Sequence, residues 1–364
     1  MQDEPHGSAN NAGNGRLPGS RTVEFQPGTR NLFFHILTRC NLNCMHCYIN
    51  QEQHGTETLD AATIKRWLGL FVKGNDFLEN RGISADNVPE KTNVIFLGGE
   101  PTLNPALADG IRAARALGYG SVTVDTNGYL FNDILHKVRP EEVDYFSFSL
   151  DGSTPEKNDP IRGSGSFEAC TAGIRQAVQM GFGVSSIFTA SSRNIDDLPN
   201  MPELLHDMGV RRFFIQIIGI RGNSAKKGGA ELQLHRKRWE TTVPDVVKRC
   251  AELGIYVTWP SVYVPDDRQF ACAGIVADNY FVFPNGRVYT CPLCEDYPIH
   301  TYEIRDGMLV KRPPINEQDL YGLKIPEGCV MNRILHPMNI EYGPDGTPRD
   351  RVACCMLKEE LIPA

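Results

Sequence analysis

Residues 31–48, NLFFHILTRCNLNCMHCY, join an apolar segment to three closely spaced cysteines. The segment 31–38 is short and rich in aromatic and branched side chains, which predicts a buried β-strand. Cys40, Cys44 and Cys47 follow with the spacing CxxxCxxC, on a loop after that strand. A zinc knuckle would supply two cysteines here and take further ligands from elsewhere, whereas three thiolates in one loop suit an iron–sulfur cluster. The loop is therefore predicted to hold a four-iron cluster with one open iron.

Further short apolar segments follow along the chain, and amphipathic stretches separate them. Further strands are predicted at 93–98, 121–126, 144–150, 184–189 and 212–218. Helical spacing is clearest at Ile64, Trp67, Leu68 and Phe71, behind Thr58 as the expected cap. Six strands, each followed by a helix, predict an α/β fold: a partial (β/α)6 TIM-like barrel that binds its ligands at the carboxyl ends of the strands.

Composition limits the class of protein. The chain has 364 residues, of which 41% are hydrophobic and 22% charged, as is ordinary for a globular protein. A net charge of −7 disfavours nucleic-acid binding, and neither an export signal nor a run of about 18 apolar residues is present, so no membrane span is expected. Eleven cysteines in such a chain indicate metal-binding or catalytic thiols in a reducing cytoplasm.

Three regions are predicted from these patterns. Residues 1–28 are poor in large apolar side chains and are expected to form a disordered tail. Residues 29–259 carry the partial barrel. Residues 260–364 are dense in Cys, Pro and Gly and are expected to form a small, irregular extension.

The first cysteine motif, with His46 before its last cysteine, resembles the signature of the radical S-adenosylmethionine (SAM) superfamily. The resemblance covers about residues 31–220 and extends to motifs at the later strand ends. It implies that Gly98, Gly99, Glu100 and Pro101 hold the methionyl amine of SAM, since glycines admit close backbone approach and Glu100 can accept from an ammonium group. It further implies contacts of SAM with His46, Thr126, Asn127, Ser149, Asp151, Arg162 and Gln216.

Six cysteines lie in the last hundred residues: Cys272, Cys291, Cys294, Cys329, Cys354 and Cys355. The stretch 281–291, FVFPNGRVYTC, predicts a hairpin with a thiol at the end of its second strand. This region resembles the SPASM and twitch extensions of radical SAM enzymes, which implies one auxiliary [4Fe-4S] cluster held by four of the six thiols. The later CxxCxxxxxCxxxC run of a full SPASM domain is absent. A structural zinc at Cys291 and Cys294 is the alternative, while Cys170 and Cys250 are expected in helix cores.

The resemblance implies an oxidoreductase-like enzyme that reductively cleaves SAM to a 5′-deoxyadenosyl radical, which takes a hydrogen from a substrate. A flavodoxin or ferredoxin would supply the electron. A peptide or protein is the favoured substrate, presented by a separate leader-binding protein because only about 30 residues precede the first strand. The alternative is dehydrogenation, epimerisation or decarboxylation of an aminosugar or tetrapyrrole, with Cys354 or Cys355 as a hydrogen donor in an epimerisation. A non-catalytic iron–sulfur electron carrier or sensor is the second alternative.

Overall fold

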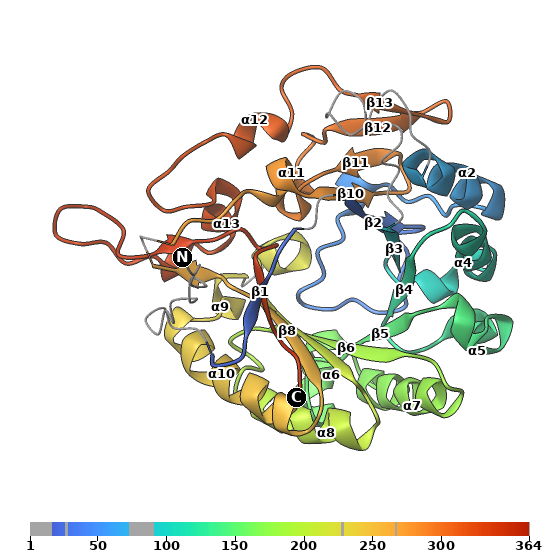
Figure 1. Ribbon diagram of the computed structural model, residues 1–364, viewed down its shortest axis with the longest axis horizontal. Coiled ribbons are helices and arrows are strands. Elements are labelled where there is room, and N and C mark those ends of the chain that lie inside the picture. The colour runs from blue at the N-terminus through green and yellow to red at the C-terminus, as the bar shows by residue number, and fades with distance from the viewer. Residues whose placement is uncertain (1–16, 26–27, 73–90, 227–228, 266–267, 364) are drawn as a thin grey trace, which may run out of the picture.

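Parallel strands form the centre of one curved, thirteen-stranded sheet in the computed structural model (Figure 1), which describes residues 17–25, 28–72, 91–226, 229–265 and 268–363. Seven of these strands follow one another in chain order, and β10 adds to the free side of β2. They are β2 (Thr29–His35), β3 (Lys91–Leu97), β4 (Ser121–Thr126), β5 (Tyr145–Ser149), β6 (Val184–Ala190), β7 (Arg212–Ile217), β8 (Tyr256–Pro260) and β10 (Asp278–Val282).

Helices cover the outer face of the curved sheet (Figure 1), where alternate strand residues such as Phe34 and Phe96 are fully buried. These helices are α2 (Ala61–Val72), α4 (Leu107–Ala116), α5 (Ile134–Lys137), α6 (Pro155–Arg162), α7 (Ser166–Gln179), α8 (Met201–Asp207) and α10 (Arg236–Glu252). Helix α2 buries the predicted stripe, but Asp60 caps it by accepting a hydrogen bond from the Thr63 amide. The expected Thr58 cap is wrong, because the helix begins three residues later.

Antiparallel strands extend both edges of the parallel sheet. On one side β15 (Lys358–Leu361) pairs with β8, and β1 (Arg21–Val23) pairs with β15; on the other, β11 (Arg287–Tyr289), β12 (Tyr302–Arg305) and β13 (Met308–Lys311) follow β10. The ladder ends at β1 and β13 and is not closed. The region after residue 260 thus borders the barrel on both sides.

The remaining short helices and strands lie outside the large sheet. They are α1 (Gln51–His54), α9 (Gly229–Leu232), α11 (Ala273–Val276), α12 (Gln318–Tyr321), α13 (Val330–Leu335) and the pair β9 (Tyr263–Val264) with β14 (Arg351–Val352). Among the described residues, none of the helices combines the length and apolar character that crossing a membrane requires.

The predicted α/β partial barrel is confirmed, with two corrections. β8 continues the parallel series, so the count of six strands is one too low; its segment, YVTWP, is short and was not recognised as a strand. Residues 21–23 were assigned to the disordered tail 1–28 but form β1, because the backbone of β15 offers them a pairing edge. Residues 1–16 of that tail lie outside the described residues.

Candidate functional site

The loop that carries Cys40, Cys44 and Cys47 lies at the carboxyl ends of the strands and is fastened there by backbone hydrogen bonds. The Glu100 amide donates to the Arg39 carbonyl (3.0 Å), and the Met45 amide donates to the Ile161 carbonyl at the end of α6 (2.9 Å). After β7, the Asn223 amide donates to the Cys47 carbonyl (2.8 Å). The loop is therefore tied to segments that follow β3, β5 and β7.

Gly98 and Gly99 leave the room that this loop needs. A Cβ on Gly99 would lie 2.4 Å from the carbonyl oxygens of Thr38 and Arg39, and one on Gly98 would lie 2.6 Å from that of Leu37. These distances are too short for any side chain. The glycines therefore act here by admitting the cysteine loop against the end of β3.

The three thiols lie close enough to affect one another's pKa, and few hydrogen-bond donors reach their sulfur atoms. The Cys40 sulfur accepts from the Leu42 amide (3.4 Å) and from Asn127 Nδ2 (3.7 Å), while Cys44 Sγ donates to the Arg162 carbonyl (3.6 Å). Burial raises the pKa of Cys40 to about 12 and that of Cys44 to about 11, and it also raises the pKa of Cys47. Each of Cys44 and Cys47 adds to the rise at Cys40, as expected for thiols grouped in one place.

Glu100 is a fully buried carboxylate that joins the ends of β3 and β4. Its Oε1 accepts from the amide and the hydroxyl of Thr102 (3.0 and 2.5 Å) and from the Thr126 hydroxyl (2.9 Å). Its Oε2 accepts from the Asn127 amide (2.7 Å). Oε1 thus accepts three hydrogen bonds and Oε2 only one, so the remaining acceptor capacity of the carboxylate lies on Oε2. Burial raises the pKa of Glu100, against these donors.

Asp151 and Arg162 form a buried ion pair beneath the cysteine loop. Arg162 Nε lies 2.6 Å from Asp151 Oδ2, and His46 Nε2 lies 3.3 Å from the same oxygen. The other carboxylate oxygen accepts from the Thr189 amide (2.7 Å). Burial lowers the pKa of His46, and Asp151 opposes that shift. The structure therefore brings three of the predicted SAM-binding residues into direct contact.

The other predicted residues lie around the same end of the sheet. Pro101 begins a short 3-10 helix directly after Glu100. Ser149 ends β5, and its carbonyl accepts from Cys170 Sγ (3.5 Å). Gln216 lies beside Thr189 in the register of β6 and β7 and is half-buried. Cys170 and Cys250 are buried in helices, as predicted.

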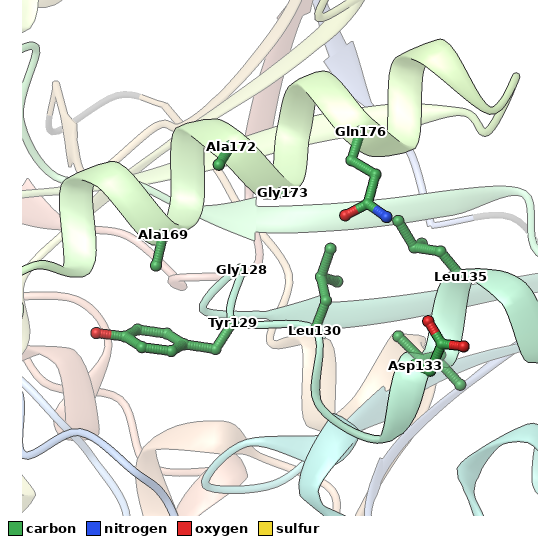
Figure 2. Close-up of a pocket in the computed structure, with 10 residues that line it drawn as sticks. Gly128, Tyr129, Leu130, Asp133, Leu135, Ala169, Ala172, Gly173 and Gln176 are labelled. Carbon is green, nitrogen blue, oxygen red and sulfur yellow. The ribbon is translucent and has the colours of Figure 1, made fainter.

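A cavity of about 220 Å³ lies behind this site, between α7 and the segment after β4 (Figure 2). Its lining combines small residues with larger apolar and aromatic side chains, and Asp133 and Gln176 lie at one end. The small residues are Gly128, Ala169, Ala172 and Gly173, and the larger ones are Tyr129, Leu130, Ile134 and Leu135. A Cβ on Gly128 would lie 2.5 Å from the Cys170 Cα, so the loop and α7 are in close contact at its inner end. The cavity contains none of the predicted cysteine or SAM residues.

The six C-terminal thiols come from four separate segments and influence one another's pKa. Cys272 and Cys329 precede α11 and α13, Cys291 and Cys294 follow β11, and the Cys354–Cys355 pair lies between β14 and β15. The pKa of Cys329 is raised to about 12, chiefly by burial, with further contributions from Cys354, Cys291 and Cys272. Cys291 and Cys329 also affect the pKa of Cys294 and that of Cys355. All six therefore belong to one group.

Three comparisons relate this chain to known proteins. Residues 34–205 match the Radical SAM superfamily. The chain belongs to the radical SAM superfamily. Members of this enzyme family use a [4Fe-4S] cluster and SAM, and the match ends before the C-terminal cysteines.

Curated relatives of this radical SAM chain have several different names. Over 207 residues it is 28% identical to the Fe-coproporphyrin III synthase of Methanosarcina barkeri (strain Fusaro / DSM 804), covering 56% of this chain and 48% of that protein. Over 276 residues it is 24% identical to the probable GTP 3',8-cyclase of Saccharolobus solfataricus, covering 74% and 84%. The chain spans about half the length of the first curated relatives that it matches.

Solved structures share the fold of this radical SAM chain. Streptococcus suis SuiB has a TM-score of 0.54 at 13% identity and is matched over 86% of this chain and 69% of that one. Native anSMEcpe with bound AdoMet has a TM-score of 0.56 at 13% identity, over 84% and 83%. These similarities concern the fold, and they agree with the partial barrel.

Both cysteine regions suit iron–sulfur clusters by their donors. Cysteine thiols at separate points around a cavity can bind the different irons of a cluster. Within the described part of the radical SAM chain, no three His, Cys, Asp or Glu side chains are arranged around one point as ligands of a single metal ion. The amide donors at the Cys40 sulfur and the positive charge of Arg162 near Cys44 favour the thiolate form that such binding needs.

The sequence analysis missed the residues that join the two cysteine regions. Tyr48 directly follows Cys47, and Glu295 directly follows Cys294. Arg221 connects them: its guanidinium lies 4.7 Å from the Tyr48 ring centroid, and its Nη1 lies 3.0 Å from Glu295 Oε2. The sequence could have pointed to Tyr48 and Glu295, because each directly follows a cysteine of a predicted cluster site. Nothing local to Arg221 identified it, because the contact depends on the loop after β7.

An aromatic stack makes a second connection. Phe283, after β10, lies between the rings of His35 and His54, with centroid distances of 4.1 and 3.9 Å. His35 Nε2 bonds the Tyr48 hydroxyl (2.7 Å), and His54 Nε2 bonds the Glu295 carbonyl (3.1 Å). Burial lowers the pKa of each histidine to about 3, so both rings are neutral.

Buried Glu317, also missed, organises the C-terminal group. It accepts from the amides of Thr290 (2.7 Å), Cys291 (3.0 Å) and Thr301 (3.2 Å). These bonds fix the backbone of Cys291 against the segment before α12. The carboxylate thus has the same structural role here that Glu100 has at the first site.

Proposed function

We propose that this chain binds a [4Fe-4S] cluster through Cys40, Cys44 and Cys47 and cleaves SAM reductively at its open iron. When bound, the cluster and SAM supply a 5′-deoxyadenosyl radical that abstracts hydrogen from a substrate. One observation carries the proposal: the three thiols share a loop that is tied to the segments after β3, β5 and β7, where the predicted SAM residues lie. An electron carrier would need the thiols but not these surrounding groups.

The chain's own residues would hold and orient SAM. Glu100 Oε2 has a single described donor, the Asn127 amide, and so has capacity to accept from an ammonium group. Arg162 is held by Asp151 next to Cys44 and is placed to attract a carboxylate. Gly98 and Gly99 let the cysteine loop lie close to the end of β3. Thr126 and Asn127 place polar groups beside this loop. Ser149 and Gln216 lie at the ends of β5 and β7.

The C-terminal thiols are proposed to bind one auxiliary [4Fe-4S] cluster through four of Cys272, Cys291, Cys294, Cys329, Cys354 and Cys355. Support comes from the mutual influence of all six on their pKa values and from the Glu317 bonds that fix Cys291. Two thiols would then remain. Cys354 or Cys355 could act as a hydrogen donor to a substrate radical in an epimerisation.

A peptide or protein is the proposed substrate, with a flavodoxin or ferredoxin as reductant in the cytoplasm and a separate leader-binding protein as partner. A structure of SuiB contains its precursor peptide, and this chain matches that structure over 88% of its length with a TM-score of 0.55. Dehydrogenation, decarboxylation or epimerisation of a tetrapyrrole or other small molecule is the second candidate, favoured by the 28% identity to Fe-coproporphyrin III synthase.

Anaerobic reduction of the reconstituted protein with SAM tests the central step. We expect 5′-deoxyadenosine in the wild type, even without substrate, and none in Asn127→Ala combined with Glu100→Ala. Iron analysis of the same samples separates loss of SAM binding from loss of the cluster. Wild-type protein that binds iron and sulfide but forms no 5′-deoxyadenosine would support the electron-carrier alternative.

A further inference from the structure

Four charged side chains occupy positions on the inner face of the curved sheet. Strand register identifies this face, because residues paired across neighbouring strands point to the same side. Phe213 and Val257 face the outer core, so Arg212 and Tyr256 face inward, and Glu360 and Lys358 lie opposite Thr258 and Pro260. Asp125, between the buried Val124 and Thr126, is the fourth.

Two of these charges already have structural partners. Arg212 lies between the rings of Tyr145 and Tyr256, 4.7 Å from each centroid. Glu360 pairs with Arg21 and accepts from the Tyr256 hydroxyl. They therefore contribute to the packing of the interior. Of the other two, Asp125 is hydrogen-bonded to Ser147 and burial raises its pKa to about 7, while Lys358 has no ion pair among the described residues.

Lys358 places an ammonium group inside the barrel with an aromatic ring as its main contact. Its Nζ lies 4.3 Å from the centroid of the Phe214 ring, and within the described residues no carboxylate lies at ion-pair distance from it. Burial lowers its pKa, whereas Cys355, Asp125 and Cys354 raise it. Lys358 is half-buried, and an ammonium group that is partly removed from water is costly unless an anion compensates it. A ring face compensates only in part.

Lys358 lies near the end of the sheet at which the SAM residues are found. It is opposite Pro260, the last residue of β8, and Phe214 precedes Gln216 by two residues on β7. Asp125 precedes Thr126, whose hydroxyl bonds Glu100. Lys358 and Asp125, which influence each other's pKa, thus belong to the interior next to the proposed radical site.

We propose that Lys358 binds a carboxylate group of the substrate inside the barrel and so sets which hydrogen faces SAM. The inference rests on the proposed function and narrows its substrate to one that carries a carboxylate. An acidic side chain of a peptide and an acid side chain of a small molecule share this chemistry. Asp125, of opposite charge, holds the ammonium group toward the interior when substrate is absent.

Binding to the cluster-loaded protein tests this. One probe is coproporphyrin III, compared with its tetramethyl ester; the other is an N-acetylated hexapeptide with a central glutamate, compared with its glutamine form. We expect the wild type to prefer one acid over its neutral counterpart by about 10- to 100-fold, the value of one charged hydrogen bond. The responding probe identifies the source. Equal binding of acid and neutral forms by both probes would overturn the proposal.

Variants assign the preference to Lys358. Lys358→Met should abolish it, Lys358→Arg should restore most of it, and Lys248→Met, at an exposed position on α10, should leave it unchanged. Asp125→Asn should tighten acid binding, because it removes a competing negative charge, and this measurement stands even where Lys358→Met folds poorly. A Lys358→Met variant that keeps the acid preference, or that changes only the iron content, would overturn the proposal.

Basal SAM cleavage separates the two proposals. Lys358→Met should form 5′-deoxyadenosine without substrate at the wild-type rate, since it lies outside the SAM-binding residues. Absence of cleavage in the wild type contradicts the proposed function and leaves the binding comparison readable. Normal cleavage with no acid preference contradicts the Lys358 assignment alone.

Discussion

The two cysteine regions reach a similar arrangement by different routes. Cys40 to Cys47 lie within eight consecutive residues, whereas Cys272 to Cys355 come from four segments of the chain. A buried carboxylate accepts several backbone and hydroxyl donors at each region: Glu317 bonds the Cys291 amide directly, whereas Glu100 joins the strand ends beside the Cys40 loop. A local motif such as the Cys40 loop therefore needs the fold only to position it. A dispersed group needs the fold to assemble it, because every intervening loop costs closure entropy.

The largest expected effect separates the two regions by chemistry. Cys44→Ala should abolish 5′-deoxyadenosine formation, because it removes a ligand of the cluster that binds SAM. Cys291→Ala should lose about four irons yet retain cleavage without substrate, because it affects only the auxiliary cluster. Iron analysis and anaerobic product assays measure both, and Cys250→Ala, in the core of α10, is the control. An iron content of Cys291→Ala equal to that of the wild type would contradict an auxiliary cluster bound through Cys291.

The next effect concerns the ion pair beneath the first region. Asp151→Asn leaves Arg162 buried without its partner, since Asp151 is 0% exposed and the Arg162 side chain 8%. We expect a loss of about 3–5 kcal/mol in the free energy of unfolding, measured by urea denaturation. Asp109→Asn, which breaks an exposed pair with Arg112, should cost below about 1 kcal/mol. Equal losses in the free energy of unfolding for the two variants would show that the buried pair stabilises the fold no more than an exposed pair does.

A pH effect is expected at the stack that joins the regions. The pKa of His54 is about 3 in the fold against 6.5 unfolded, so the unfolded chain binds more protons and stability falls as pH drops from about 6.5 toward 3. Between pH 7 and 5 this amounts to about 2 kcal/mol. His54→Gln should remove that part of the pH dependence in urea unfolding curves, and His136→Gln, at an exposed position, should not. An unchanged slope in His54→Gln would contradict a neutral, buried His54.

The smallest effect concerns the contact of Arg221 with Tyr48. A double-mutant cycle with Arg221→Met and Tyr48→Leu should give a coupling energy of about 1 kcal/mol, as for a partly desolvated cation over an aromatic ring. The exposed pair Arg249 and Glu203 serves as a reference cycle, with a smaller coupling energy expected because water screens an exposed ion pair. A coupling no larger than the reference would mean that the two regions are joined by the histidine stack rather than by Arg221.

The sequence by itself predicted the elements whose cause is local. Apolar strands of five to eight residues, the helical stripe of α2 and the CxxxCxxC loop are all written in short windows, so six of the seven successive parallel strands and the first cysteine site could be anticipated. The exceptions follow the same rule. β8 and β1 lack a strong local pattern and exist because neighbouring strands provide their pairing partners.

Only the tertiary structure decided which distant residues meet. It placed β10 beside β2 and β15 beside β8, which brings Phe283 between two histidines and Lys358 into the barrel interior. It also drew the six C-terminal thiols into one group. Strand order and loop path determine such contacts, and the side chains that benefit from them carry no local signal, because their partners lie tens to hundreds of residues away in the chain.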